Sequence, residues 1–402
     1  MGMKFENAVM MGLGYIGLPT AAIMAKSGIK VKGVDVNPTV VETVNKGKIH
    51  IVEPDLAGLV YSVINNNMLS ASIEPSRADV FLIAVPTPFK GDHVPDISYV
   101  ESATRKIIPY LEKGNLFIIE STSPIFTTEK MAKLIFSERP ELKGEIYLAY
   151  CPERVLPGNV IYELENNDRV IGGVNEESTD AAIAFYSKFV KSTLHKTNAR
   201  TAEMCKLVEN SSRDVSIAFA NELSMICDKA EINVWELIEL ANKHPRVNIL
   251  QPGTGVGGHC IAVDPWFIVS DFPVESKIIK SAREINNYKT LWVIEKIKNS
   301  ILQFEKEKGR KPVVALMGVA FKPDIDDLRE SPAKQVVEHL VSLNDTDYLV
   351  VEPNVKELDI AKPVHYSEAY EGADIVVFLV AHREFFTINK TKQELDFCGI
   401  RK

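Results

Sequence analysis

The chain has 402 residues, of which 46% are hydrophobic and 25% are charged. These fractions are typical of a globular protein and exclude a disordered or collagen-like chain, and the length predicts two or three domains. The 54 acidic residues outnumber the 46 basic ones, which gives a formal charge of −8. This acidic excess argues against nucleic acid as a partner, although not against a local pocket for an anion.

The cysteines and the two ends of the chain indicate a cellular compartment. The five cysteines are odd in number and contain no C-x-x-C pair, which argues against a disulfide framework or a structural zinc site. We also find no ligand cluster for another metal. The amino-terminal stretch holds no cleavage site, and the apolar run at residues 375–381 is too short to span a bilayer. We therefore expect a soluble cytoplasmic protein with no metal and no membrane contact.

The first part of the chain, residues 1–197, alternates short apolar runs with helical patterns. This alternation predicts a Rossmann-like domain with a doubly wound parallel sheet. The expected strands lie at residues 8–11, 31–35, 80–85, 116–120, 147–150 and 169–172.

Residues 198–304 are predicted to form a central helical domain. Residues 199–232 contain neither Pro nor Gly and predict one long helix, which favours a homodimer because such helices often pack against a symmetry mate. The charged residues 305–311 predict a linker. Strand patterns return in residues 312–402, which predicts a second Rossmann-like α/β domain.

A glycine fingerprint follows the first predicted strand. Gly12, Gly14 and Gly17 form G-x-G-x-x-G, in which the glycines allow the backbone to approach a pyrophosphate at the amino end of a helix. Asp35 lies 18 residues after Gly17, near the place expected for an acid that binds a ribose hydroxyl. Because a carboxylate there repels the extra phosphate of NADP, we predict NAD as the cofactor. A glycine turn that binds nothing is the alternative.

Two loops with threonine follow later strands of the same predicted sheet. Thr87 lies in residues 85–88 and Thr122 in residues 120–124. In open α/β sheets, ligands lie beyond the carboxyl ends of the strands, so both side chains are candidate neighbours of the cofactor. Ordinary loop chemistry is the alternative for both.

A glycine-rich loop at residues 253–258 leads to Cys260. Its backbone N–H groups are suited to a phosphate, and a helix that began at Cys260 would stabilise the thiolate. Asp264 would then share that face. We predict that Cys260 is a nucleophile, with a buried structural cysteine as the alternative.

The predicted long helix carries Lys206, Asn210 and Arg213 along one stripe. A cation, an amide and a second cation suit an oxyanion or a phosphate, although a solvated helix face has the same pattern. Lys322 and Arg329 follow the first strand of the last domain and are ambiguous on local grounds.

Together, these motifs resemble those of the UDP-glucose/UDP-N-acetylmannosamine dehydrogenase family, whose members use NAD to oxidise a nucleotide sugar at carbon 6. The likeness extends from about Val9 to about Ala381. Several stretches are most similar to members that act on UDP-N-acetyl-D-mannosamine: residues 47–55, 86–92, 151–158 and 244–253. Phe126 departs from the family, which usually has a small residue there, and residues 386–402 are unlike those of relatives.

The resemblance implies roles for individual residues. Cys260 would be the nucleophile, Lys206 would stabilise the oxyanion, and Glu153 would assist hydrolysis of a thioester. Asn210 and Asp264 would position the reacting centre and its water. Contacts with NAD are implied for Tyr15, Ile16, Asp35, Thr87, Thr122 and Arg329. Contacts with the UDP-sugar are implied for Arg154, Val155, Lys206, Asn210, Arg213, His244, Arg246, Gly257, Phe321 and Lys322, and Arg246 would act across a dimer interface.

The resemblance therefore predicts a four-electron oxidation of UDP-N-acetyl-D-mannosamine to its uronate for a surface polysaccharide. The same chemistry on UDP-N-acetylglucosamine, UDP-glucose or another UDP-hexose is the nearest alternative, because few contacts distinguish such sugars. A two-electron β-hydroxyacid dehydrogenase is more distant, since it would not need Cys260. A non-catalytic module that senses NAD or a nucleotide sugar would bind without turnover.

Overall fold

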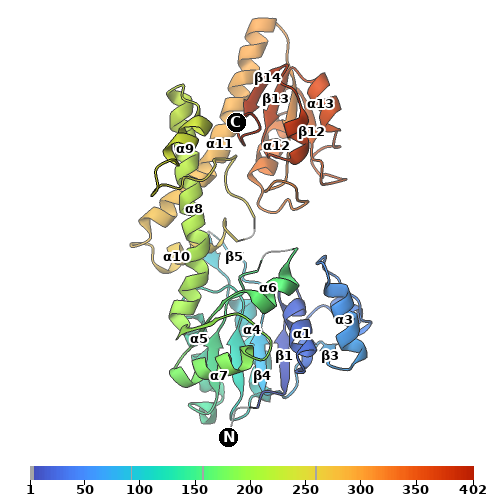
Figure 1. Cartoon of the computed structure of the whole chain (residues 1–402), viewed down its shortest axis with the longest axis vertical. Helices are drawn as coiled ribbons and strands as arrows, with labels where there is room; N and C mark the ends of the chain where they lie inside the picture. Colours follow the sequence, from blue (N-terminus) through green and yellow to red (C-terminus); the bar gives the residue numbers. More distant parts are fainter. Residues whose placement is uncertain (1–3, 92, 156–157, 259) are drawn as a thin grey trace. The chain divides into compact units, whose positions relative to one another are not determined.

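The computed structural model describes residues 4–91, 93–155, 158–258 and 260–402 (Figure 1). The backbone forms two compact units. The first contains the chain up to Val208 together with Trp266–Asp271, and the second contains Glu209–Pro265 and Phe272–Lys402. Among the described residues, no helix is long and apolar enough to cross a membrane. The division into domains at residues 1–197, 198–304 and 312–402 remains a prediction.

The described part of the first unit contains an eight-stranded sheet with the order β10-β9-β8-β7-β4-β1-β2-β3. The chain winds outward from β1 in one direction and then crosses to β4, which confirms the predicted Rossmann-like order. The sequence did not reveal β3 and β10, which are short and partly polar. The strands are β1 (Asn7–Met11), β2 (Lys30–Val34), β3 (Leu69–Ser72), β4 (Val80–Ile83), β7 (Leu116–Ile119), β8 (Tyr147–Tyr150), β9 (Arg169–Gly173) and β10 (Leu194–Asn198).

The direction of β9 differs from the predicted parallel sheet. It runs antiparallel to β8, pairing Gly172 with Tyr150 and Gly173 with Ala149, and β10 then runs parallel to β9. The other pairings in this sheet are parallel. The amino end of β9, with Arg169, therefore lies at the same edge as the carboxyl ends of β8 and β7.

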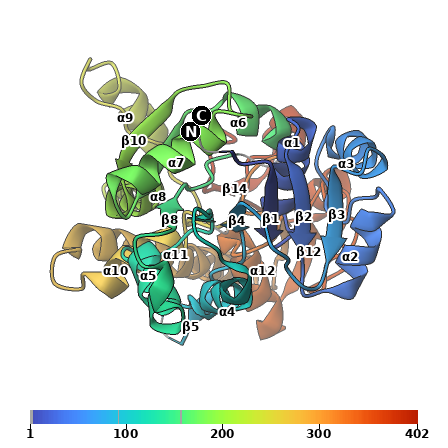
Figure 2. The same cartoon turned by 90° about the horizontal axis from the view of Figure 1, so that it is seen from below.

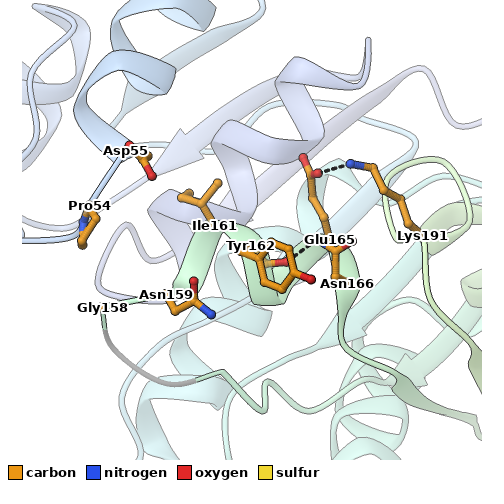
Figure 3. A pocket seen from close by; sticks show the side chains of 9 residues that line it. All are labelled: Pro54, Asp55, Gly158, Asn159, Ile161, Tyr162, Glu165, Asn166 and Lys191. Carbon is orange, nitrogen blue, oxygen red and sulfur yellow. Dashed lines mark hydrogen bonds and ion pairs between the residues drawn. The ribbon is translucent and has the colours of Figure 1, made fainter.

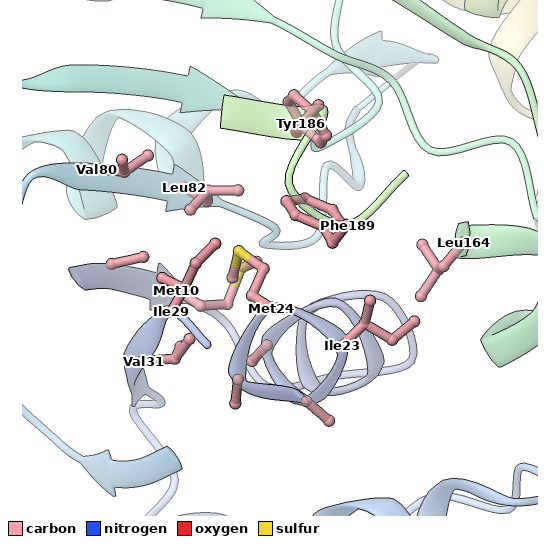
Figure 4. Packing of buried hydrophobic residues seen from close by; sticks show 14 of the residues in the cluster. Met10, Ile23, Met24, Ile29, Val31, Val80, Leu82, Leu164, Tyr186 and Phe189 are labelled. Atoms are coloured by element: carbon pink, nitrogen blue, oxygen red, sulfur yellow. The ribbon is translucent and has the colours of Figure 1, made fainter. Parts of the chain in front are cut away.

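Helices cover both faces of the first sheet, so its central strands are buried on both sides, as in other parallel sheets. Figure 2 shows α1, α6 and α7 over one face and α4 and α5 over the other. One core joins β1, β4, α1 and α7 through buried side chains that include Met10, Leu82 and Tyr186 (Figure 4). The helices are α1 (Gly17–Lys26), α2 (Pro38–Asn45), α3 (Leu56–Asn65), α4 (Ser98–Ile107), α5 (Thr127–Glu138), α6 (Val160–Asn166) and α7 (Glu176–Tyr186); β5 (Phe89–Lys90) and β6 (Val94–Pro95) form a small hairpin.

The long helix predicted at residues 199–232 is confirmed as α8 (Ala199–Lys229). It is followed by α9 (Val234–Ala241), α10 (Asp264–Asp271) and α11 (Lys277–Lys308). The predicted linker at residues 305–311 is wrong in its first half, because α11 continues through Lys308 and ends at Gly309 with a φ of 66°. The charge pattern of an exposed helix end is similar to that of a linker.

The second unit contains a parallel sheet with the order β12-β11-β13-β14 in its described residues. The strands are β11 (Val313–Met317), β12 (Asp347–Val351), β13 (Ile375–Phe378) and β14 (Gln393–Asp396), with α12 (Pro332–Leu343) and α13 (Tyr366–Gly372) as helices. Separate apolar clusters pack on its two faces. The predicted second α/β fold is confirmed, and its last strand lies in the unusual carboxyl-terminal stretch.

Candidate active site

The glycine fingerprint connects β1 to α1. Gly12 has a φ of 94°, and a Cβ on it would lie 2.4 Å from the Ala84 carbonyl oxygen. A Cβ on Gly17 would lie 1.9 Å from the Gly12 oxygen, whereas no atom of the described neighbours lies within 4 Å of a Cβ on Gly14. The loop therefore packs tightly against neighbouring backbone at Gly12 and Gly17, whereas the space beside Gly14 is open. This arrangement fits a backbone that approaches a pyrophosphate.

Asp35 directly follows β2 and holds the fingerprint in place. Its Oδ2 accepts a hydrogen bond from the Leu13 N–H at 3.0 Å, and its Oδ1 accepts one from the Asn37 N–H at 2.9 Å. A carboxylate oxygen has more than one lone pair, so both oxygens retain capacity for a ribose hydroxyl. Tyr15 and Ile16 precede α1, and half of the Tyr15 surface is exposed. These residues fit NAD, which would lie at the amino end of α1.

Thr87 and Thr122 lie together at the same sheet edge. The Thr87 hydroxyl donates a hydrogen bond to the Thr122 carbonyl oxygen at 2.6 Å. Ser121 strengthens this junction, because its hydroxyl accepts from the Val85 N–H at 2.8 Å and donates to the Val85 oxygen at 2.7 Å. The loops after β4 and β7 are therefore fixed to each other beside the switch point of the sheet.

Glu153 follows β8 and is buried, with 7% of its surface exposed. Its Oε2 accepts a hydrogen bond from Nη1 of Arg169 at 2.7 Å, and its Oε1 accepts one from the Arg154 N–H at 2.7 Å. Sequence reasoning missed Arg169, because a fully parallel sheet would place it at the opposite edge. The available signal was an arginine at the start of a buried strand, since such a charge requires a partner.

A second buried carboxyl group neighbours this pair. The Tyr186 hydroxyl donates a hydrogen bond to Oε1 of Glu120 at 2.5 Å, while the buried Oε2 has no partner among the described residues. Burial raises the pKa of Glu120 to about 7, although the Arg169 charge opposes this shift. Burial also raises the pKa of the Cys151 thiol to about 12, so this cysteine stays protonated and unreactive.

The loop that carries Arg154 and Val155 is anchored at its far end by Glu53. The buried Glu53 carboxylate accepts hydrogen bonds from the Gly158 N–H at 2.9 Å and the Val160 N–H at 2.8 Å. Val160 is the first residue of α6, so Glu53 also caps that helix from a distant part of the chain. Arg154 itself donates to the Asp168 carbonyl oxygen at 3.4 Å.

A cavity of about 350 Å³ lies beside α6 (Figure 3). None of the predicted site residues lines it. Its walls mix acidic, basic and aromatic side chains, and Glu165 is paired there with Lys191 and, at 2.8 Å, with Lys26. The lining residues are Pro54, Asp55, Gly158, Asn159, Ile161, Tyr162, Glu165, Asn166 and Lys191.

In the second unit, the exposed Cys260 lies in a turn just before α10. Its carbonyl oxygen accepts hydrogen bonds from the N–H groups of Val263 at 3.0 Å and Asp264 at 2.8 Å. The condition considered from the sequence, a helix that begins at Cys260, is not met, because α10 begins at Asp264. Pro265 marks this start in the sequence, since proline is favoured in the first turn of a helix.

Asn210 connects α8 to this turn. Its Nδ2 donates a hydrogen bond to Oδ2 of Asp264 at 2.6 Å, and Asp264 is 4% exposed. The structure therefore brings Asn210, Asp264 and the Cys260 backbone together, as predicted. Lys206, Thr122 and Glu153 belong to the first unit, and their approach to Cys260 remains a prediction.

The glycine-rich loop packs against the loops of the second sheet. The Gly258 N–H donates a hydrogen bond to the Arg329 oxygen at 3.3 Å. A Cβ on Gly257 would lie 2.4 Å from the Glu330 oxygen and 2.9 Å from Cβ of Phe321. Gly257 is thus required because the glycine-rich loop lies close to the segments with Phe321 and Glu330. This packing places three predicted site residues side by side: Gly257, Phe321 and Arg329. A phosphate at the loop remains a prediction.

The loop with Phe321 and Lys322 is held by Glu352, which directly follows β12. Oε2 of Glu352 accepts hydrogen bonds from the N–H groups of Val319 at 2.8 Å and Ala320 at 2.9 Å, and lies 3.1 Å from Nε2 of His382. Burial raises the pKa of Glu352, but the hydrogen bond and charge of His382 outweigh it and hold the pKa below its usual value. Lys322 is exposed at the tip of this supported loop.

The remaining predicted ligand contacts are exposed in the second unit: His244, Arg246 and Arg213 for the substrate, and Arg329 for NAD. The Arg246 N–H donates a hydrogen bond to Nδ1 of His244 at 3.3 Å, in the segment after α9. Arg213 is exposed on α8, and Arg329 forms an ion pair with Asp327 at 2.7 Å. Their contacts with a ligand remain predictions.

Family models match nearly the whole chain. The NAD binding domain of the UDP-glucose/GDP-mannose dehydrogenase family matches residues 6–190, the central domain residues 200–288, and the UDP binding domain residues 315–397. The chain belongs to this family. It is an NAD-dependent dehydrogenase that acts on a nucleotide sugar.

Individual relatives are similar over almost their full length. A UDP-N-acetyl-D-mannosamine dehydrogenase from Campylobacter jejuni is 55% identical, covering 98% of this chain and 100% of the relative. An NDP-N-acetyl-D-galactosaminuronic acid dehydrogenase from Ralstonia nicotianae is 50% identical over 95% and 92% of the two chains. The solved UDP-N-acetyl-mannosamine dehydrogenase from S. aureus has a TM-score of 0.84 at 41% identity, over 98% and 95% of the two chains.

Proposed function

We propose that this enzyme oxidises UDP-N-acetyl-D-mannosamine at carbon 6 to UDP-N-acetyl-D-mannosaminuronate. The observation that carries the reaction is the exposed Cys260, whose turn is joined to Asp264 and through it to Asn210. A cysteine nucleophile is what distinguishes a four-electron oxidation from a two-electron one, because it retains the aldehyde-level intermediate. The relative that is 55% identical supports the choice of sugar.

The side chains carry out the addition between the two oxidations and the hydrolysis that follows them. Bound NAD would accept a hydride in each oxidation. Cys260 adds to the aldehyde carbon to form a thiohemiacetal, which the second oxidation converts to a thioester. Lys206 stabilises negative charge on the sugar oxygen, and Asn210 and Asp264 position the attacking water. Glu153 accepts the proton of that water, so that hydrolysis releases the uronate and the Cys260 thiolate.

We further propose the setting in which this reaction takes place. The chain acts as a homodimer in the cytoplasm, where its scattered cysteines stay reduced, with Arg246 reaching across the dimer interface. Its three domains bind NAD, join the subunits and bind UDP, in that order along the chain. The uronate product serves the synthesis of a surface polysaccharide.

Comparison of kcat/KM for four sugars tests the substrate. UDP-N-acetylmannosamine is expected to exceed UDP-N-acetylglucosamine, UDP-glucose and UDP-N-acetylgalactosamine by about tenfold or more, a discrimination that a few pocket contacts supply. A preference for UDP-N-acetylgalactosamine would overturn the choice of sugar in favour of the function named for the Ralstonia relative. NAD binding without turnover of any of the four would contradict the dehydrogenase reaction on these sugars.

A further inference from the structure

One buried cation in the first unit neighbours two buried carboxyl groups. Arg169 is 2% exposed at the start of β9, and Glu153 and Glu120 are 7% and 2% exposed after β8 and β7. Buried charges are stable only when they are paired and hydrogen-bonded. The single charge of Arg169 therefore balances one of the two carboxylates.

The hydrogen bonds identify Glu153 as the ionised partner. Each of its oxygens accepts from a donor, Nη1 of Arg169 on one side and the Arg154 N–H on the other, both at 2.7 Å. Glu120 has only the Tyr186 hydroxyl on Oε1, and its Oε2 has no partner among the described residues. An oxygen without a donor does not stabilise a negative charge, so Glu120 takes up a proton more readily than Glu153.

The other titratable groups of the cluster are neutral. Burial raises the pKa of Cys151 to about 12, and burial together with the nearby acidic groups raises that of Tyr186 well above its usual value. The ring of Tyr186 lies under the Arg169 guanidinium, with 5.7 Å from Cζ to the ring centre. Glu153 and Arg169 are thus the hydrogen-bonded ion pair of this cluster.

We propose that Arg169 is a positioning residue for hydrolysis of the acyl-enzyme, because it keeps Glu153 ionised and fixes one of its oxygens. This inference rests on the proposed role of Glu153. In the step, the water oxygen bonds to the thioester carbon and one water proton moves to the Glu153 carboxylate. The carbon–sulfur bond then breaks and its electron pair stays on the Cys260 sulfur. The uronic acid ionises, and Glu153 returns its proton to solvent.

The experiment follows hydrolysis separately from oxidation. Enzyme, UDP-N-acetylmannosamine and excess NAD are mixed and quenched, and acyl-enzyme at Cys260 is measured by intact mass while NADH is measured by absorbance. In R169Q we expect NADH formation in the first turnover to stay within about threefold of wild type, while acyl-enzyme accumulates and kcat falls about 100-fold, as for loss of a general base.

Three further variants, R169K, E120Q and E153Q, keep the test decisive if R169Q does not fold. R169K retains the charge but not the two-pronged donor geometry, so it should recover at least tenfold of the lost hydrolysis rate. E120Q should accumulate less acyl-enzyme than E153Q, because Glu120 is not the proposed base. R401K is the matched control, since Arg401 forms an ion pair with Glu394 at 2.8 Å in the second unit and should not alter hydrolysis.

The outcomes separate this inference from the proposed function. Wild-type hydrolysis in R169Q and R169K would overturn it. An equal loss of both oxidations and hydrolysis would also overturn it, because that result indicates a merely structural role. If E153Q hydrolyses the acyl-enzyme normally, or if wild-type enzyme never forms one, the proposed function of Glu153 or Cys260 fails instead.

Discussion

The backbone conformation of Phe126 does not follow from its residue type. It lies just before α5 with a φ of 71°, in the left-handed region that favours glycine. The family's preference for a small residue at this position is consistent with that conformation. The Arg200 guanidinium lies 5.0 Å from the ring centre, and the Phe126 N–H donates to Oε2 of Glu203 at 2.7 Å. These contacts offset part of the backbone strain.

Comparison of F126G with F126A isolates that strain. Both variants lose the ring and its contact with Arg200, but only glycine relaxes the positive φ. We expect F126G to be more stable than F126A by about 1 kcal/mol in free energy of unfolding. Urea denaturation of the two variants checks this order. Equal stability, or a more stable F126A, would show that the backbone at this position is unstrained.

Single residues were predictable where their chemistry is local. Gly12, Gly17 and Asp35 follow from a short motif, and the structure explains each by a contact within the fingerprint or with a neighbouring strand. Arg169 and Glu53 were not predictable, because their partners are 16 and 105 or more residues away. The buried strand that begins at Arg169 indicates that this charge has a partner, but the neighbouring sequence identifies neither that partner nor those of Glu53.

At the scale of elements, Glu53 determines where α6 begins and where the loop with Arg154 and Val155 ends. It accepts the Gly158 and Val160 N–H groups with its two carboxylate oxygens. Hydrogen bonds to a buried charged group contribute more than neutral ones, and their loss leaves two amide groups without partners. Glu53 therefore joins the loop after α2 to the segment that leads into α6.

E53A is expected to lower the free energy of unfolding by about 3 kcal/mol, because two charge-assisted hydrogen bonds are lost. Hydrogen exchange at the Gly158 and Val160 amides should accelerate, and KM for the UDP-sugar should rise. N175A is the control, since Asn175 caps α7 through the Ser178 N–H and should cost about 1 kcal/mol without changing those two amides. Unchanged exchange in E53A would contradict the anchoring role.

Elements were predictable from periodicity, but not the direction of every strand. The absence of Pro and Gly correctly predicted α8, and buried apolar runs correctly predicted β4 and β7. A buried strand has the same composition in either direction, so the reversal of β9 was not visible. It depends on tertiary packing, and it brings Arg169 to the edge that carries Glu153.

At the scale of the whole molecule, the loops after β1 and β11 have the same hydrogen-bond pattern, although they lead into different segments. Gly12 and Gly318 follow the first strand of each sheet and donate to the last residue of the neighbouring strand, at 2.8 and 2.9 Å. Asp35 and Glu352 then accept from the next N–H group. Only the first loop continues into a glycine fingerprint. Glu352 is enclosed by a second N–H group and by His382, which suits a supporting role for the loop with Lys322.

The central claim is a four-electron oxidation that depends on Cys260, and the yield of NADH tests it most directly. With limiting UDP-N-acetylmannosamine and excess NAD, wild-type enzyme is expected to form two NADH per sugar and a uronate. C260A is expected to form at most one, because it cannot hold the aldehyde as a thiohemiacetal. One NADH per sugar from wild-type enzyme, or two from C260A, would contradict the account.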